Sequence, residues 1–220
     1  MFFFDLDGTI LDVSERYYQI YTHILKKYRY KYLSKKEYWT LKRNKTSEAE
    51  ILRLTKAEDI KDLYVQLFQN LIESDNFLIL DKIWPDLKET YFELFKKNTS
   101  FIVTLRKNRK TLINQLKRLN LLKMFSNVYS DEQKKINKNK TNPKIQILEK
   151  VLVKNNVDKS NCFFIGDTET DIKTGKFFSM STIALSFGIR SPDILKTFNP
   201  HIIFDTQKQF KNYLENNFFS

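Results

Sequence analysis

The chain opens with an apolar run that stops abruptly at two carboxylates. Residues 2–4 are three phenylalanines, followed by Asp5, Leu6, Asp7 and Gly8. A short apolar run of this kind, bounded by a glycine, predicts a buried β-strand. Side chains at positions i and i+2 of a strand point to the same side. We therefore expect Asp5 and Asp7 to converge beyond the C-terminal end of the strand, where open α/β sheets bind ligands.

Two carboxylates at this spacing suit two kinds of chemistry. They can bind a hard cation such as Mg²⁺ through oxygen, or one can attack an electrophile while the other transfers protons. The alternative is an acidic turn that only ends the strand, and the tetrapeptide alone leaves both interpretations open. Gly8 lets the backbone leave the strand with dihedral angles that other residues avoid.

Composition limits the class of protein. With 220 residues, 41% of them hydrophobic, the chain can form one large core or a core plus a small accessory domain. Its single cysteine, Cys162, excludes an internal disulfide framework and fits a reducing compartment. The N-terminal apolar run is too short for a signal peptide, and no stretch approaches the roughly 20 apolar residues of a membrane span. We expect a cytoplasmic protein without membrane association.

The formal charge of +12 raises the question of nucleic-acid binding. Lysine is spread over the whole chain together with abundant Asn, Ile, Phe and Tyr, which indicates a compositional bias more than a dedicated nucleic-acid surface. Nucleic acid is therefore not the expected partner. Positive charge would still attract small anionic substrates.

Residues 14–83 contain no Gly or Pro, and their apolar residues recur at helical spacing. A break is expected at residues 41–46, after which Ser47 and Glu50 have the spacing of a helix-starting capping box. We predict a small helical bundle. Its many aromatic residues are interpreted as core.

From residue 84 onward, predicted helices and strands alternate, which indicates a parallel sheet covered by helices on both faces. The fold class is therefore α/β, a Rossmann-like parallel sheet with an inserted all-helical domain. The predicted core domain comprises residues 1–13 and 84–220, and the inserted domain residues 14–83. Strands are expected at residues 100–104, 125–129, 162–165, 181–186 and 202–204.

Chemically useful groups follow three of these strands. Asp5 and Asp7 follow the first, Thr104 ends another, and Asp167 follows the run Phe163–Gly166. Parallel strands end at one edge of their sheet, so these groups can meet despite their separation in sequence. Thr104 taken alone would be interpreted as a cap of the next helix.

Asp5–Thr9 resembles the first motif of the haloacid dehalogenase superfamily, most of whose members are Mg²⁺-dependent phosphatases. Thr104 resembles its second motif, and the run from Gly166 and Asp167 to Asp171 resembles its fourth. The third motif is a lysine, usually in Lys-Pro-x-Pro. Here the best match is Lys140 in Lys140–Pro143, which lacks the first proline, so Lys138 and Lys144 compete with it.

The resemblance covers essentially the whole chain, and the helical insertion is similar to the C1 cap of phosphoglycolate phosphatase relatives. It implies hydrolysis of a small phosphomonoester through an aspartyl phosphate, with Mg²⁺ as cofactor. The roles it implies are a nucleophile (Asp5), a proton carrier (Asp7), phosphoryl-binding groups (Thr104 and Lys140), metal ligands (Asp5, the Asp7 carbonyl and Asp167) and an orienting acid (Asp171).

Substrate contacts are expected from Gly8, Thr9 and Arg43. The Thr9 hydroxyl either caps the following turn or contacts Asp7, and we favour this structural role over direct binding. Residues 42–45 correspond in position to the cap loop that closes over the substrate, where Arg43 could bind a second anionic group. A solvated turn between helices is at least as good an interpretation.

Three alternatives remain open. A phosphomutase of the β-phosphoglucomutase type would use the same pair of aspartates. A non-catalytic regulatory protein could retain the scaffold, and a phosphatase could process nucleic-acid ends. The expected partner is a small phosphorylated metabolite; neither its identity nor the choice between monomer and homodimer follows from the sequence.

Overall fold

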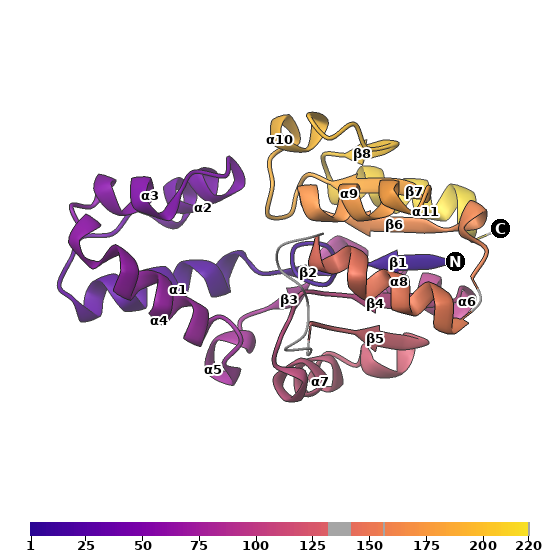
Figure 1. Cartoon of the computed structure of the whole chain (residues 1–220), viewed down its shortest axis with the longest axis horizontal. Coiled ribbons are helices and arrows are strands. Elements are labelled where there is room, and N and C mark those ends of the chain that lie inside the picture. The colour runs from indigo at the N-terminus through magenta and orange to yellow at the C-terminus, as the bar shows by residue number, and fades with distance from the viewer. Residues whose placement is uncertain (132–141, 156, 220) are drawn as a thin grey trace.

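The computed structural model describes residues 1–131, 142–155 and 157–219. Its centre is a six-stranded parallel sheet, with strand order β5-β4-β1-β6-β7-β8 (Figure 1). This confirms the predicted α/β fold. The strands are β1 (Phe2–Phe4), β4 (Ser100–Val103), β5 (Asn127–Tyr129), β6 (Phe163–Gly166), β7 (Ser181–Leu185) and β8 (Ile202–Phe204).

The first strand lies in the middle of the sheet because it is apolar on both sides. Phe2 and Phe4 join one core cluster and Phe3 joins another, as the alternation of side chains along a strand requires. β1 pairs with β4 and with β6, with Phe2 opposite Ser100 and Phe163. All three phenylalanines are at most 1% exposed, so both faces of the sheet are covered.

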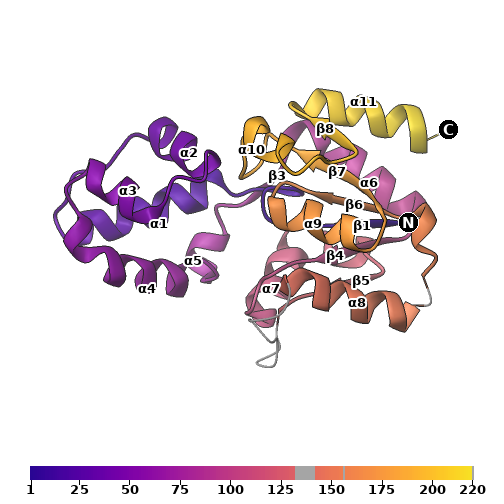
Figure 2. The ribbon, with the colours of Figure 1, turned by 45° about the horizontal axis from the view of Figure 1, so that its top comes forward.

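Helices cover the two faces separately (Figure 2). Side chains of α6, α7 and α11 pack in the cluster that holds Phe2 and Phe4, whereas α8 packs against Phe3. Each helix buries its apolar stripe on the sheet. The helices are α6 (Lys88–Lys97), α7 (Arg109–Arg118), α8 (Pro143–Asn155), α9 (Glu169–Phe177), α10 (Pro192–Lys196) and α11 (Gln207–Phe218), with short 3₁₀ turns at Pro85–Leu87, Leu122–Met124 and Lys159–Asn161.

Residues 14–83, called the helical cap below, lie to one side of the sheet (Figures 1 and 2). Their core contains Ile20, Tyr21, Tyr38 and Tyr64, so the aromatic residues are core as predicted. The helices are α1 (Ser14–Lys27), α2 (Lys35–Arg43), α3 (Glu48–Leu54), α4 (Lys61–Leu71) and α5 (Asp75–Leu78), with a 3₁₀ turn at Glu58–Ile60.

The starts of α2 and α3 test the capping prediction. Ser47 accepts the main-chain N–H of Glu50 and caps α3, as expected. A complete capping box occurs one helix earlier, where Ser34 and Glu37 bond each other reciprocally at the start of α2.

The chain enters and leaves the helical cap through one short antiparallel ribbon. It consists of β2 (Leu11–Asp12) and β3 (Lys82–Ile83), with Leu11 opposite Ile83. This ribbon was not predicted, because two-residue strands leave no periodic signal. It places both crossings next to the acidic loop after β1. The division at residues 13 and 83 into separate domains stays a prediction.

Among the described residues, none of the helices combines the length and apolar character needed to span a bilayer.

A residue in the turn after α9 has a strained backbone angle, and its cost to stability can be measured. Ser179 has φ 58°, in the left-handed region that glycine occupies at many helix C-termini. We expect Ser179→Gly to raise the free energy of unfolding by about 0.5–1 kcal/mol, because it removes the Cβ penalty at this angle. Urea denaturation would measure the change. Ser181→Gly, in the regular strand β7, should lower stability; a loss in both variants would contradict this account.

Candidate active site

Asp5 lies at the tip of the central strand. Its main-chain N–H donates to the carbonyl of Ile165 at 2.9 Å, so the pairing of β1 with β6 continues to the acid. The residue is only 6% exposed. Burial raises the pKa of the Asp5 carboxyl to about 7, because the neighbouring lysine does not fully compensate for the lost water.

The lysine beside Asp5 is Lys144, in the first turn of α8. Its Nζ donates to Asp5 Oδ1 at 2.6 Å and also to Asp171 Oδ1. Burial opposes the charged ammonium, yet the two carboxylates outweigh it and hold the pKa of Lys144 above its usual value. Lys140, the position preferred from sequence, lies outside the described residues, as does Lys138. The structure thus brings the alternative lysine, Lys144, into contact with Asp5.

Asp167 and Asp171 follow β6 but have different surroundings. Asp171 uses Oδ1 for Lys144, and its Oδ2 accepts the main-chain N–H groups of Asp167 and Thr168 and the Thr168 hydroxyl. Its oxygens are therefore fully engaged within the protein. Within residues 1–131, 142–155 and 157–219, Asp167 accepts only from Thr9 Oγ1 and the Ile189 N–H. Burial, with Asp5 and Asp171 nearby, raises its pKa well above the usual value.

Thr9 and Gly8 shape the loop around Asp167. The Thr9 hydroxyl donates to Asp167 Oδ1 at 2.9 Å and is fully buried, so its contact is neither Asp7 nor the cavity. Gly8 has φ 82°, and a Cβ there would lie 2.0 Å from Asp167 Oδ2. The backbone angle and the close approach both require glycine. Both residues support an acid, and neither is among the residues that line the cavity.

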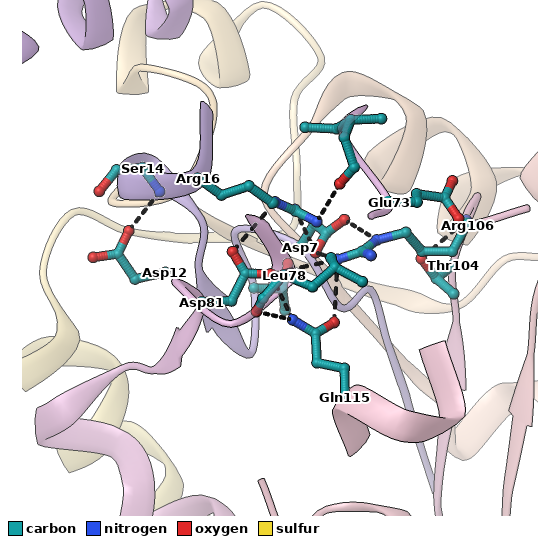
Figure 3. Close-up of polar contacts among 12 residues, drawn as sticks. Asp7, Asp12, Ser14, Arg16, Glu73, Leu78, Asp81, Thr104, Arg106 and Gln115 are labelled. Atoms are coloured by element: carbon teal, nitrogen blue, oxygen red, sulfur yellow. Dashed lines mark hydrogen bonds and ion pairs between the residues drawn. The ribbon is translucent and has the colours of Figure 1, made fainter. Parts of the chain in front are cut away.

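Asp7 is held by two arginines that the sequence analysis did not single out (Figure 3). Arg106 donates from Nε to Oδ2 and from Nη2 to Oδ1, each at 2.6 Å. Arg16 Nη2 lies 3.0 Å from Oδ1. Although burial acts to raise it, the two guanidinium groups hold the pKa of Asp7 well below its usual range.

The same two arginines bind a second buried acid, Asp81, which precedes β3. Arg16 Nε lies 3.2 Å and Arg106 Nη2 3.5 Å from its carboxylate, and Gln115 Nε2 donates to it at 2.7 Å (Figure 3). Two guanidinium groups and two carboxylates thus form a balanced network. It joins the acidic loop, the helical cap and α7.

One signal could have revealed Arg106. It stands two residues after Thr104, the same spacing that made Asp5 and Asp7 candidates at their strand end. Arg16 and Asp81 carry no comparable signal, because their role depends on where the helical cap lies.

Thr104 and Asp5 line one cavity of about 300 Å³. Thr104 is 2% exposed and sits at the end of β4, where its N–H continues the pairing to Tyr129. The cap contributes Tyr17, Ile72 and Glu73 to the walls. The other lining residues are Asp7, Leu105, Arg106, Lys144, Thr168, Glu169, Thr170, Ile189 and Arg190.

Arg43 lies in the contact between the helical cap and the sheet domain, and it is not among the residues that line the cavity. Its guanidinium donates to the carbonyl of Ser186, and its carbonyl accepts the N–H of Ser191 at 3.0 Å. Beside it, Lys45 pairs with Glu169 at 2.8 Å. The loop at residues 42–45 therefore rests on the sheet domain, and a substrate contact by Arg43 stays a prediction.

The donor set fits a hard divalent cation. Asp5, Asp167 and Asp171 each offer an oxygen within 4.8 Å of the others, and all three are buried. Among the described residues, Lys144 is the only one whose positively charged side chain contacts any of these three carboxylates. Oxygen donors and an excess of buried negative charge are what Mg²⁺ requires. Since Asp171 is occupied by internal donors, Asp5 and Asp167 are the better ligands.

The fold and this site define the class of protein. The family model for haloacid dehalogenase-like hydrolases matches residues 2–185, so the chain belongs to that family. A pyrophosphatase, PpaX, of Oceanobacillus iheyensis is 24% identical over 208 residues, covering 93% of this chain and 92% of the relative.

Solved structures share the fold over nearly the whole length. A haloacid dehalogenase-like hydrolase from Streptococcus pneumoniae has a TM-score of 0.75 and 18% identity, with 96% of both chains covered. A predicted phosphoglycolate phosphatase from Haemophilus somnus has a TM-score of 0.71 and 19% identity, covering 98% of this chain and 96% of its own.

Stability should depend on pH when metal is removed. The folded pKa of Asp5, about 7, exceeds its ordinary value of 3.8, so the folded protein binds a proton that the unfolded chain has lost. With chelator present, we expect Tm to fall as pH rises from about 5 to about 8. Mg²⁺ should raise Tm and weaken this dependence, because it replaces the proton.

Lys144 and Asp7 do not oppose this trend, since their shifts change stability only above about pH 10 and below about pH 4. Thermal unfolding with and without Mg²⁺ would measure the effect, and Asp5→Asn should reduce it. A Tm that stays constant or rises over this window in chelator would contradict the assignment.

Proposed function

We propose that this chain is a Mg²⁺-dependent phosphatase that hydrolyses a small phosphomonoester through an aspartyl phosphate. The observation that carries the proposal is the contact of Asp5 with Lys144 at 2.6 Å in a cavity that Thr104 also lines. A carboxylate nucleophile, a fixed cation and a hydroxyl donor are the groups that phosphoryl transfer needs. The cavity of about 300 Å³ suits a small substrate.

Asp5 is the proposed nucleophile. One of its oxygens attacks phosphorus, the bond from phosphorus to the ester oxygen breaks, and the leaving oxygen takes a proton from Asp7. Water then attacks the aspartyl phosphate, returns a proton to Asp7 and releases inorganic phosphate. Because Asp7 is held by two arginines in this structure, its proton transfer requires that at least one of those contacts loosens.

Lys144 and Thr104 are the proposed phosphoryl-binding groups. The ammonium sits against Asp5 and would meet the charge that develops on the phosphoryl oxygens. Asp171 holds that ammonium from the other side and is therefore a positioning residue. Mg²⁺, bound by Asp5, Asp167 and the Asp7 carbonyl, would offset the repulsion between carboxylates and phosphate.

The remaining predicted contacts take supporting roles in this proposal. Thr9 orients Asp167 through its hydroxyl, and Gly8 provides the close approach to that acid. Arg43 holds the cap loop against Ser186. A phosphomutase would use the same acids, and product analysis with a hexose 1-phosphate separates the two activities. The complete set of acids favours catalysis over a purely regulatory protein.

Asp5→Asn tests the nucleophile. Amide nitrogen cannot replace the attacking carboxylate oxygen, so we expect kcat to fall by about 10³-fold or more while the fold persists. Phosphate release from a panel of phosphorylated metabolites with Mg²⁺, together with circular dichroism, measures both. Asp62→Asn, on the outer helix α4, is the matched control and should leave kcat unchanged. Mg²⁺-dependent turnover by pure Asp5→Asn would refute the nucleophile assignment.

A pair of lysine variants identifies the phosphoryl-binding lysine. Lys144→Gln removes the ammonium that contacts Asp5, so kcat/KM should fall by about 10²-fold or more. Lys140→Gln should change kcat/KM by no more than about threefold, because the Lys144 contact persists. Steady-state kinetics on one substrate decides between them, and the reverse order of losses would restore Lys140 to the role predicted from sequence.

A further inference from the structure

Arg106 is a cationic residue that lines the cavity, and the proposed mechanism gives it no contact with the substrate. It lines the cavity, yet its side chain is only 4% exposed. Its Nε and Nη2 atoms donate to both oxygens of Asp7, and Nη2 also reaches Gln115 at 3.3 Å. The planar guanidinium is thus fixed in one orientation against the proposed proton carrier.

Among the residues that the structure describes, none supplies an acceptor for the third nitrogen of this guanidinium. Nη1 of Arg106 is buried and makes no hydrogen bond within the described part of the chain. A buried donor without an acceptor is costly and uncommon in folded proteins. Since Arg106 also lines the cavity, a bound ligand can supply the missing acceptor.

The position of Arg106 indicates which part of the substrate it meets. The transferred phosphoryl group belongs beside Asp5, Thr104 and Lys144. Asp7 is the group proposed to protonate the leaving oxygen, and Arg106 bonds both of its carboxylate oxygens at 2.6 Å. Arg106 therefore adjoins the leaving group.

The other nearby arginines are each paired with carboxylates of the protein. Arg190 donates to Glu169 at 3.0 Å and to the Lys42 carbonyl. Arg16 spans Asp7 and Asp81 and is not among the lining residues. Because Arg16 also contacts Asp7, that carboxylate has a second cationic partner besides Arg106.

We propose that Arg106 is the specificity-determining residue of this site, and that it binds an acidic group carried by the leaving group. The substrate class is then a compact phosphoester or phosphoanhydride whose leaving group bears a carboxylate or a second phosphoryl group. The free Nη1 can donate a charge-assisted hydrogen bond to an oxygen of either group while Nε and Nη2 stay on Asp7. The cavity of about 300 Å³ favours a small acid. This inference rests on the proposed phosphatase function.

The test compares acidic and neutral leaving groups on the same enzyme. Phosphoglycolate and pyrophosphate are the acidic substrates, 2-phosphoglycolamide is the neutral analogue of the former, and p-nitrophenyl phosphate reports general phosphatase activity. With Mg²⁺, we expect wild-type kcat/KM for at least one acidic substrate to exceed that for the amide by about 10- to 100-fold, as for a charge-assisted hydrogen bond. Which acid is preferred distinguishes a carboxylate from a phosphoryl group.

Arg106→Gln should reduce this preference to within about threefold of unity, mainly through KM for the acidic substrate. Arg106→Lys keeps the charge but loses the planar guanidinium that holds Asp7 and places Nη1 at the same time, so the preference should still fall at least about threefold. This variant decides the matter if Arg106→Gln does not fold. Arg118→Gln is the matched control. It removes an arginine of α7 that bonds the Leu78 carbonyl and is not among the cavity-lining residues, and it should retain the preference.

The outcomes separate the two proposals. Hydrolysis of p-nitrophenyl phosphate without any preference for an acidic leaving group would overturn the inference and leave the phosphatase function standing. A preference that survives in a folded Arg106→Gln or Arg106→Lys would also overturn it. Absence of hydrolysis of all four compounds by the wild type would refute the phosphatase function itself, and the inference with it.

Discussion

The candidate active site depends on several buried carboxylates that the fold holds close together at one edge of the sheet. Asp5, Asp167 and Asp171 share one small volume, and like charges so close together repel strongly when water is excluded. Lys144 relieves part of that repulsion by bonding two of them. Main-chain N–H groups and hydroxyls relieve more, as at Asp167. What remains is an excess of acidic groups, and this excess makes the site suitable for binding a cation.

The negative charge of Asp7 is balanced differently, by pairing with arginines. Asp7 lies only two residues from Asp5, yet two arginines neutralise it, and they also hold Asp81 next to the ribbon that connects the helical cap. Two neighbouring carboxylates therefore have opposite environments, one short of positive charge and one fully paired. In the proposed mechanism Asp5 must be ionised to attack and Asp7 must be protonated to act as an acid, so both roles depend on a change in these contacts when metal and substrate bind. The pairing with arginines also ties the chemistry to the position of the helical cap.

Local rules explain which parts of this site were predictable. The groups at strand ends, such as Asp5, Thr104 and Asp167, follow from the geometry of parallel strands, and the structure brings all three to one edge. The phosphoryl-binding lysine could not be chosen from sequence, because several lysines surround Pro143; within the described residues, Lys144 contacts Asp5 from the start of α8. The Arg16–Asp81 pair could not be predicted from the sequence, since its partners are far apart in the chain and meet only through the packing of the helical cap.

The central place of β1 has a consequence for how the protein is made. Its three phenylalanines leave the ribosome long before their partners Ser100 and Phe163, which come much later in the chain. The helical cap, whose contacts are more local, can form in the meantime. Until the later strands appear, an apolar strand with two unpaired edges is exposed, which is a hazard for aggregation during synthesis. A protein arranged in this way completes the edge that holds its acids only after β6 and α9 have been made, and it depends most on protection before that point.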